Sequence, residues 1–129
     1  MHALVIDDSR TMRMMLARQL EHLGFEVLQA GDGQQALEVL ASNRDDLPVL
    51  ATVDWNMPVM NGLDFVKAVR ADNGLRDVTL MMVTTEAEQG QIVRALAAGA
   101  HEYLIKPFSA EAFVDKLDYL GVKPGRGAA

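Results

Sequence analysis

The sequence of 129 residues contains no cysteine. Disulfide bonds, thiolate catalysis and cysteine-ligated zinc are therefore excluded, and the composition fits a reducing compartment such as the cytoplasm. The chain also has no apolar run approaching twenty residues, so we expect no membrane-spanning helix. The first eight residues include neither a basic region nor a small-residue cleavage site, and we expect no signal peptide there.

Clusters of basic side chains are missing as well. The chain carries 12 lysines and arginines against 18 aspartates and glutamates, which gives a net charge of −6. Binding to nucleic acid phosphates needs clustered basic residues, so nucleic acid is not expected as a direct partner. Half of the residues are hydrophobic and 23% are charged. This balance is typical of one soluble globular domain with a buried core.

Short apolar runs alternate with segments of helical periodicity five times along the chain. The apolar runs, which favour β-strands, cover residues 3–6, 25–28, 49–53, 78–83 and 103–105. The helical segments carry apolar residues that are expected to face the core: Met12, Met15, Leu16, Leu20 and Leu23; Ala36, Leu37 and Leu40; Leu63, Val66 and Val69; Ile92, Val93 and Leu96; and Phe113, Leu117 and Leu120.

This alternation predicts an α/β fold, a doubly wound five-stranded parallel sheet with five helices, because parallel neighbours must be joined by crossovers. The runs 3–6, 49–53 and 78–83 are apolar throughout, which indicates central strands covered on both faces. We expect one domain over residues 1–121. Residues 122–129 are rich in glycine and proline and are expected to form a flexible tail.

Polar side chains follow four of the five predicted strands: Asp7 and Asp8, Asp54, Thr84, and Lys106. The carboxyl ends of parallel strands meet at one edge of a sheet, where ligands bind. Carboxylates brought together there would repel one another, and Mg²⁺ with its oxygen ligands would relieve the repulsion. A threonine hydroxyl and a lysine ammonium complete a pocket suited to phosphoryl transfer. Asp54 is the best nucleophile, because a carboxylate can carry a phosphoryl group.

Each of these residues also has a structural explanation. Asp7 and Asp8 could form a turn and cap the next helix, and Thr84 could cap the helix after its strand. Asp54 could simply end a strand, and Lys106 could be a solvated loop lysine. Their joint placement at one sheet edge favours a functional site over four separate coincidences.

Three stretches carry a family resemblance. They are residues 7–13 (DDSRTMR), 53–62 (VDWNMPVMNG) and 99–108 (GAHEYLIKPF). In this order they resemble the acidic turn, the phosphoacceptor loop and the lysine loop of the receiver domain of two-component response regulators, in particular the stand-alone, CheY-like chemotaxis type. The resemblance runs from about residue 2 to residue 121. It implies a flavodoxin-like (βα)5 fold and a cytoplasmic signalling module rather than an enzyme.

The resemblance also implies roles for the site residues. Asp54 would accept a phosphoryl group from the phosphohistidine of a histidine kinase. Asp8 and Asp54 would ligate Mg²⁺ together with the backbone carbonyl of Asn56, and Asp7 would act largely through water. Lys106 would pair with Asp54 and then with a phosphoryl oxygen.

Further residues would convert phosphorylation into a signal. Thr84 would move to bind the phosphoryl group and Tyr103 would turn inward, a two-state change biased by a local charge. Asn56 and Glu86 would flank the approach of the hydrolytic water and set a short lifetime of the phosphoryl group. Apart from this transfer to itself and its own dephosphorylation, no catalysis is expected.

Partners would bind the face made by the fourth helix, the fifth strand and the fifth helix. We expect a monomer in the unphosphorylated state, and phosphorylation could produce a dimer. The fourth helix is expected to begin at Glu86, and Glu88 and Gln89 stand where receivers that bind the flagellar switch typically carry lysines. This departure counts against the flagellar switch as the target, although Lys116 keeps one basic site on the last helix.

Four alternatives remain open at this point. The chain could be the receiver half of a longer regulator or a phosphorelay intermediate. It could be an aspartyl-phosphate phosphatase, but such enzymes need a second acid where this chain has Asn56. It could bind a flavin-type cofactor, but the loop after the first strand carries Asp7 and Asp8, which would repel a phosphate.

Overall fold

A computed structural model of the chain describes residues 1–85 and 90–123. One parallel sheet has the strand order β2-β1-β3-β4-β5. The strands are β1 (His2–Ile6), β2 (Glu26–Ala30), β3 (Leu50–Val53), β4 (Thr79–Thr85) and β5 (Glu102–Lys106). The helices are α1 (Arg10–His22), α2 (Gly33–Ser42), α3 (Gly62–Arg70), α4 (Ile92–Ala98) and α5 (Ala110–Leu120), with a short 3₁₀ helix η1 (Asn73–Leu75). The predicted doubly wound α/β fold is confirmed.

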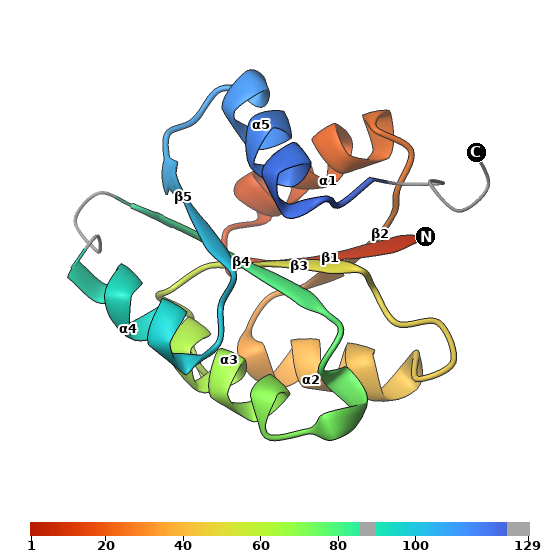
Figure 1. Cartoon of the computed structure of the whole chain (residues 1–129), viewed down its shortest axis with the longest axis vertical. Helices are drawn as coiled ribbons and strands as arrows, with labels where there is room; N and C mark the ends of the chain where they lie inside the picture. Colours follow the sequence, from red (N-terminus) through yellow and green to blue (C-terminus); the bar gives the residue numbers. More distant parts are fainter. Residues whose placement is uncertain (86–89, 124–129) are drawn as a thin grey trace.

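Helices cover both faces of the sheet. Helices α1 and α5 lie on one face, and α2, α3 and α4 lie on the other (Figure 1). Strand β1 contributes apolar side chains to the cores on both faces of the sheet. Ala3 and Val5 belong to the core cluster beneath α1 and α5, whereas Leu4 and Ile6 belong to the cluster on the opposite face. Because successive side chains of a strand point to opposite faces, a strand at the centre must be apolar throughout.

The strand order creates a switch point in the middle of the sheet. From β1 the chain first adds β2 on one side and then crosses to place β3 on the other side. In the register of this pair, Ile6 lies opposite Val53. The next residues, Asp7 and Asp54, therefore leave the sheet side by side. In doubly wound sheets this point at the carboxyl edge is where ligands bind.

Helix α1 has its own cap. The Ser9 hydroxyl accepts a hydrogen bond from the Met12 amide at 3.3 Å, as N-cap residues do. The predicted alternative that Asp7 and Asp8 cap this helix is therefore wrong. Asp7 does shape the turn, because its Oδ1 accepts a hydrogen bond from the Ser9 amide at 2.9 Å.

Three apolar residues that were expected to face the core are exposed instead. Val93 is 74% exposed, and Met15 and Leu96 are each 38% exposed. Helix α4 buries Ile92 and Ala95, a stripe too narrow to include the neighbouring rows. The predicted start of this helix at Glu86 falls in residues 86–89, outside the described residues.

The last helix ends as its sequence indicates. Gly121 adopts a left-handed conformation with φ of 72°, which lets the chain fold back after α5. Val122 then donates its amide hydrogen to the Leu117 carbonyl at 3.0 Å and is buried. Packing therefore continues one residue past the predicted domain end at residue 121. Residues 124–129 of the predicted tail lie outside the described residues.

None of the helices in the ranges 1–85 and 90–123 is both long and apolar enough to cross a membrane. The strands and helices instead bury their apolar residues against one another, in the two clusters on either side of the sheet.

Gly62, the first residue of α3, packs directly against the loop that carries Asp54. A Cβ atom at this position would overlap the Asp54 carbonyl oxygen and lie 3.1 Å from the Trp55 Cα. Both obstacles are backbone atoms that cannot rotate away. We predict that Gly62→Ala lowers the free energy of unfolding by about 2–3 kcal/mol in urea denaturation. Gly90→Ala is the matched control, because no described atom lies within 4 Å of its added Cβ. Equal effects of the two substitutions would contradict the prediction.

Candidate functional site

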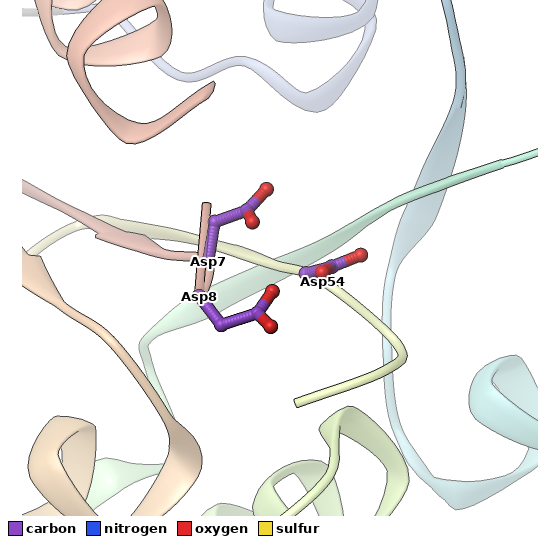
Figure 2. Close-up of side chains that lie close together, drawn as sticks. All are labelled: Asp7, Asp8 and Asp54. Carbon is purple, nitrogen blue, oxygen red and sulfur yellow. The ribbon is translucent and has the colours of Figure 1, made fainter. Parts of the chain in front are cut away.

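Three carboxylates meet at the switch point of the sheet. Figure 2 shows Asp7 and Asp8, at the end of β1, beside Asp54, at the end of β3. One oxygen from each lies within 4.8 Å of the others. Asp7 and Asp54 are only 1% and 7% exposed, whereas Asp8 is exposed to solvent. The sequence prediction that these side chains gather at one edge is confirmed by this geometry.

Backbone groups fix the two buried carboxylates. The Asp54 amide donates to the Ile6 carbonyl at 3.0 Å, and Asp54 Oδ1 accepts from the Trp55 amide at 2.9 Å. The Asp7 amide donates to the Ala30 carbonyl at 3.1 Å. These backbone bonds tie both residues to the neighbouring strands, and the amides of Trp55 and Ser9 orient the carboxylates of Asp54 and Asp7.

Lys106 brings a positive charge to the carboxylates from β5. Its Nζ lies 2.9 Å from Asp7 Oδ2 and 3.4 Å from Asp54 Oδ1, and its side chain is 14% exposed. Burial alone would lower the pKa of this ammonium, but the hydrogen bond to Asp7 and the charges of Asp54 and Asp7 outweigh burial and raise the pKa. Lys106 therefore stays charged. Its shorter contact is with Asp7, so it bridges two carboxylates rather than pairing with Asp54 alone.

Thr84 contributes a buried hydroxyl. It is 1% exposed, and among the residues that the structure describes none hydrogen-bonds to its Oγ1. It lies inside β4, so the predicted alternative of a helix-capping threonine is wrong. Leaving a buried hydroxyl unpaired costs about 1–3 kcal/mol. Such a group needs an explanation, and an oxygen-rich ligand at this edge would provide its missing partner.

Of the three remaining predicted residues, the structure locates Asn56 and Tyr103. Asn56 is exposed in the loop after β3. Tyr103 is half-buried in β5, one strand beyond Thr84. Glu86 lies outside the described residues, so its predicted role near the site is not addressed by the geometry.

Sequence reasoning missed one supporting residue. Arg13 of α1 donates from Nη1 to the backbone carbonyl of Asp7 at 2.8 Å, which fixes the turn that presents the carboxylates. Asp7 follows a strand and Arg13 lies in the next helix, so no single period relates the two residues. The pattern of the sequence therefore offered no signal for this contact.

Comparison with known proteins agrees with the geometry. A sequence profile of the response regulator receiver domain matches residues 3–118. The chain belongs to this family of receivers.

Chemotaxis proteins are among the relatives of this receiver. The chemotaxis protein CheY homolog of Campylobacter jejuni is 46% identical, over 100% of this chain and 99% of the relative. Chemotaxis protein CheY1 of Helicobacter pylori is 47% identical, over 92% and 94% of the two chains. The solved structure of CheY4 of Vibrio cholerae, 35% identical, superposes with a TM-score of 0.83 over 92% of this chain and 97% of the other.

These similarities define the class of function. The receiver is a phosphorylation-dependent response regulator of the chemotaxis type, similar along its whole length to CheY-like receivers. Receivers of this kind are signalling proteins rather than classical enzymes, and they act between a histidine kinase and a downstream target. The phosphatase and cofactor-binding alternatives are not favoured.

The ion pairs of Lys106 generate a prediction about stability. Lys106→Met leaves the buried Asp7 and Asp54 carboxylates without this positive charge. We expect the free energy of unfolding in urea, without divalent cations, to fall by about 2–3 kcal/mol. Lys67→Met, on the exposed side of α3, is the control.

A double variant isolates the electrostatic part of this effect. Lys106→Met combined with Asp54→Asn should cost less than the sum of the two single substitutions, because one of the uncompensated charges is gone. Simple additivity would show that Lys106 does not interact electrostatically with Asp54.

Proposed function

We propose that Asp54 is the phosphoacceptor of this receiver, and that it takes the phosphoryl group from a phosphohistidine of a histidine kinase. An oxygen of the Asp54 carboxylate forms the new bond to phosphorus as the bond from phosphorus to the histidine nitrogen breaks, and the electron pair stays with the imidazole. The convergence of a buried carboxylate, a lysine and an unpaired buried hydroxyl at one sheet edge carries this proposal. Catalysis is limited to this self-directed transfer and to hydrolysis of the product.

The three carboxylates fit a magnesium site. Asp8 and Asp54 would be direct ligands, together with the backbone carbonyl of Asn56. Asp7 Oδ1 and Oδ2 already accept from the Ser9 amide and Lys106, which suits a role through water. When bound, Mg²⁺ would neutralise carboxylate charge and hold phosphoryl oxygens.

Lys106 and Thr84 would then respond to the new group. The Lys106 ammonium can exchange a carboxylate oxygen for a phosphoryl oxygen while keeping its positive charge. The Thr84 hydroxyl would gain the hydrogen-bond acceptor that the described residues do not supply. These new contacts differ between the two states, which is what a population shift requires. Tyr103 would follow by turning inward.

The output surface of this proposal consists of α4, β5 and α5. Val93 on α4 and Tyr119 on α5 are 74% and 79% exposed, so both side chains are accessible to a partner. A downstream protein would bind here after phosphorylation. We place the protein in the cytoplasm, where it is a monomer without phosphorylation and can dimerise through the same face once phosphorylated.

Asn56 and Glu86 complete the proposal as residues that set the lifetime of the phosphoryl group. Asn56 is exposed two residues after Asp54, where it can meet water that approaches the phosphorus. A polar side chain there favours fast autodephosphorylation and a signal that resets quickly.

Intact-protein mass spectrometry after incubation with acetyl phosphate tests the acceptor. We expect a single added phosphoryl group that requires Mg²⁺, is lost at alkaline pH and is absent from Asp54→Asn. Beryllofluoride, which mimics the phosphoryl group, guards against an adduct that hydrolyses too fast to be seen. Labelling of Asp54→Asn at the wild-type rate, or silence in both assays, would refute the assignment.

The magnesium site predicts a stability change that does not depend on phosphorylation. Mg²⁺ at ten times its dissociation constant should raise the free energy of unfolding by about 1.4 kcal/mol. Asp8→Asn should abolish most of this increase, since it removes an exposed ligand without disturbing the core. Asp45→Asn, an exposed carboxylate before β3, should keep the full increase. An equal response of both variants would exclude Asp8 as a ligand.

A further inference from the structure

Glu102, Tyr103 and Lys116 form a closed cluster on the outer edge of the sheet. Glu102 Oε1 accepts a hydrogen bond from the Tyr103 amide at 2.9 Å. The same Oε1 lies 3.1 Å from Lys116 Nζ, and this Nζ lies 4.6 Å from the centroid of the Tyr103 ring. Glu102 thus connects the Tyr103 backbone to the Lys116 ammonium, and this ammonium lies over the Tyr103 ring.

The environment of the cluster strengthens these contacts. The Glu102 and Lys116 side chains are 17% and 29% exposed, so water screens them only partly. An ammonium over an aromatic face is attracted more strongly when it is partly desolvated. Lys116 comes from the middle of α5, and Glu102 anchors its ammonium at the strand, which leaves the ammonium little freedom to leave the ring.

Tyr103 lies beside the unpaired hydroxyl of Thr84. In the β4–β5 register, Tyr103 is opposite Met82, and Thr84 is opposite Ile105. Tyr103 and Thr84 are therefore diagonal neighbours on one face of the sheet, the face on which Met82 and Tyr103 pack with α3 and α4. A ring that leaves Lys116 can turn toward Thr84, whereas a ring held by Lys116 stays at the edge.

We infer that Lys116 is a positioning residue that holds Tyr103 at the edge of the sheet and so opposes the switch to the active conformation. The inference rests on the proposed function, in which Tyr103 turns inward on phosphorylation. Lys116 acts on the ring from α5, and its ion pair is with Glu102 rather than with the carboxylates of the site, so it biases the switch without taking part in phosphoryl transfer. Its contribution sets how much of the protein is active before any phosphoryl group arrives.

The expected effect is a shift in an equilibrium. Lys116→Met keeps the length of the side chain and removes the charge, so the ring loses its cation. We expect the ratio of inward to edge-bound Tyr103 to rise roughly two- to fivefold. Lys116→Arg keeps the positive charge over the ring and should restore the wild-type ratio.

Fluorine NMR of the full chain measures this ratio directly. Incorporation of 3-fluorotyrosine in a Tyr119→Phe background leaves Tyr103 as the one labelled tyrosine of the sequence. The resonance of Tyr103 is recorded with and without Mg²⁺ and beryllofluoride for the Lys116 parent, Lys116→Met and Lys116→Arg. Without beryllofluoride, the Lys116→Met resonance should move toward the position of the beryllofluoride-bound parent, and the half-saturating beryllofluoride concentration should fall by the same factor. Thermal unfolding confirms that each variant is folded.

The outcomes separate the inference from the proposed function. One outcome is that beryllofluoride moves the parent resonance, but the Lys116→Met and parent resonances coincide in the absence of beryllofluoride. The inference about Lys116 is then overturned, and the proposed movement of Tyr103 is retained. If beryllofluoride leaves the parent resonance unchanged, the proposed role of Tyr103 is wrong, and the inference about Lys116 is wrong as well. A shift in both Lys116→Met and Lys116→Arg would show that side-chain shape, rather than charge, positions the ring, and would also overturn the inference.

Discussion

The mutual repulsion of carboxylates at the ends of β1 and β3 is the constraint on which the rest of the site depends. The strand register forces Asp7 and Asp54 together, and the turn after β1 adds Asp8. Two of these side chains are buried, where an uncompensated charge is costly. Lys106 offsets the cost only because its long side chain crosses β4, which separates β5 from β3. The sheet order and the lysine therefore belong to one electrostatic arrangement.

This arrangement leaves some charge unbalanced and one hydroxyl unpaired among the described residues. One lysine faces three clustered carboxylates, so the site retains an excess of negative charge that a divalent cation can balance. On the other side, Thr84 carries a hydroxyl for which the described residues provide no acceptor. The carboxylates thus suit a cation, and the unpaired hydroxyl suits an oxygen-rich group. Lys106 of β5 and Thr84 of β4 therefore surround the buried Asp54 from neighbouring strands, one with a charge and the other with an unpaired hydroxyl.

Much of this architecture could be predicted from the sequence, because central strands and carboxyl-edge side chains leave strong local patterns. The uniformly apolar runs identified β1, β3 and β4 as central, and the polar residues after the strands identified the site. What escaped prediction depends on register and on packing between distant elements. Val93 follows the helical period but lies outside the narrow buried stripe of α4. The preference of Lys106 for Asp7, and the contact of Lys116 with Tyr103, become visible only when strands and helices are placed side by side.

Glu102 also affects how the edge strand β5 is exposed to other copies of the protein. An edge strand presents backbone groups to which a strand of another chain can add, and such addition begins edge-to-edge aggregation. On β5, the carboxylate of Glu102 already takes the Tyr103 amide, and the Lys116 ammonium stands beside it. An incoming strand would have to break a charged pair to gain one hydrogen bond. The Glu102–Lys116 pair thereby protects this part of the edge of β5 against strand addition.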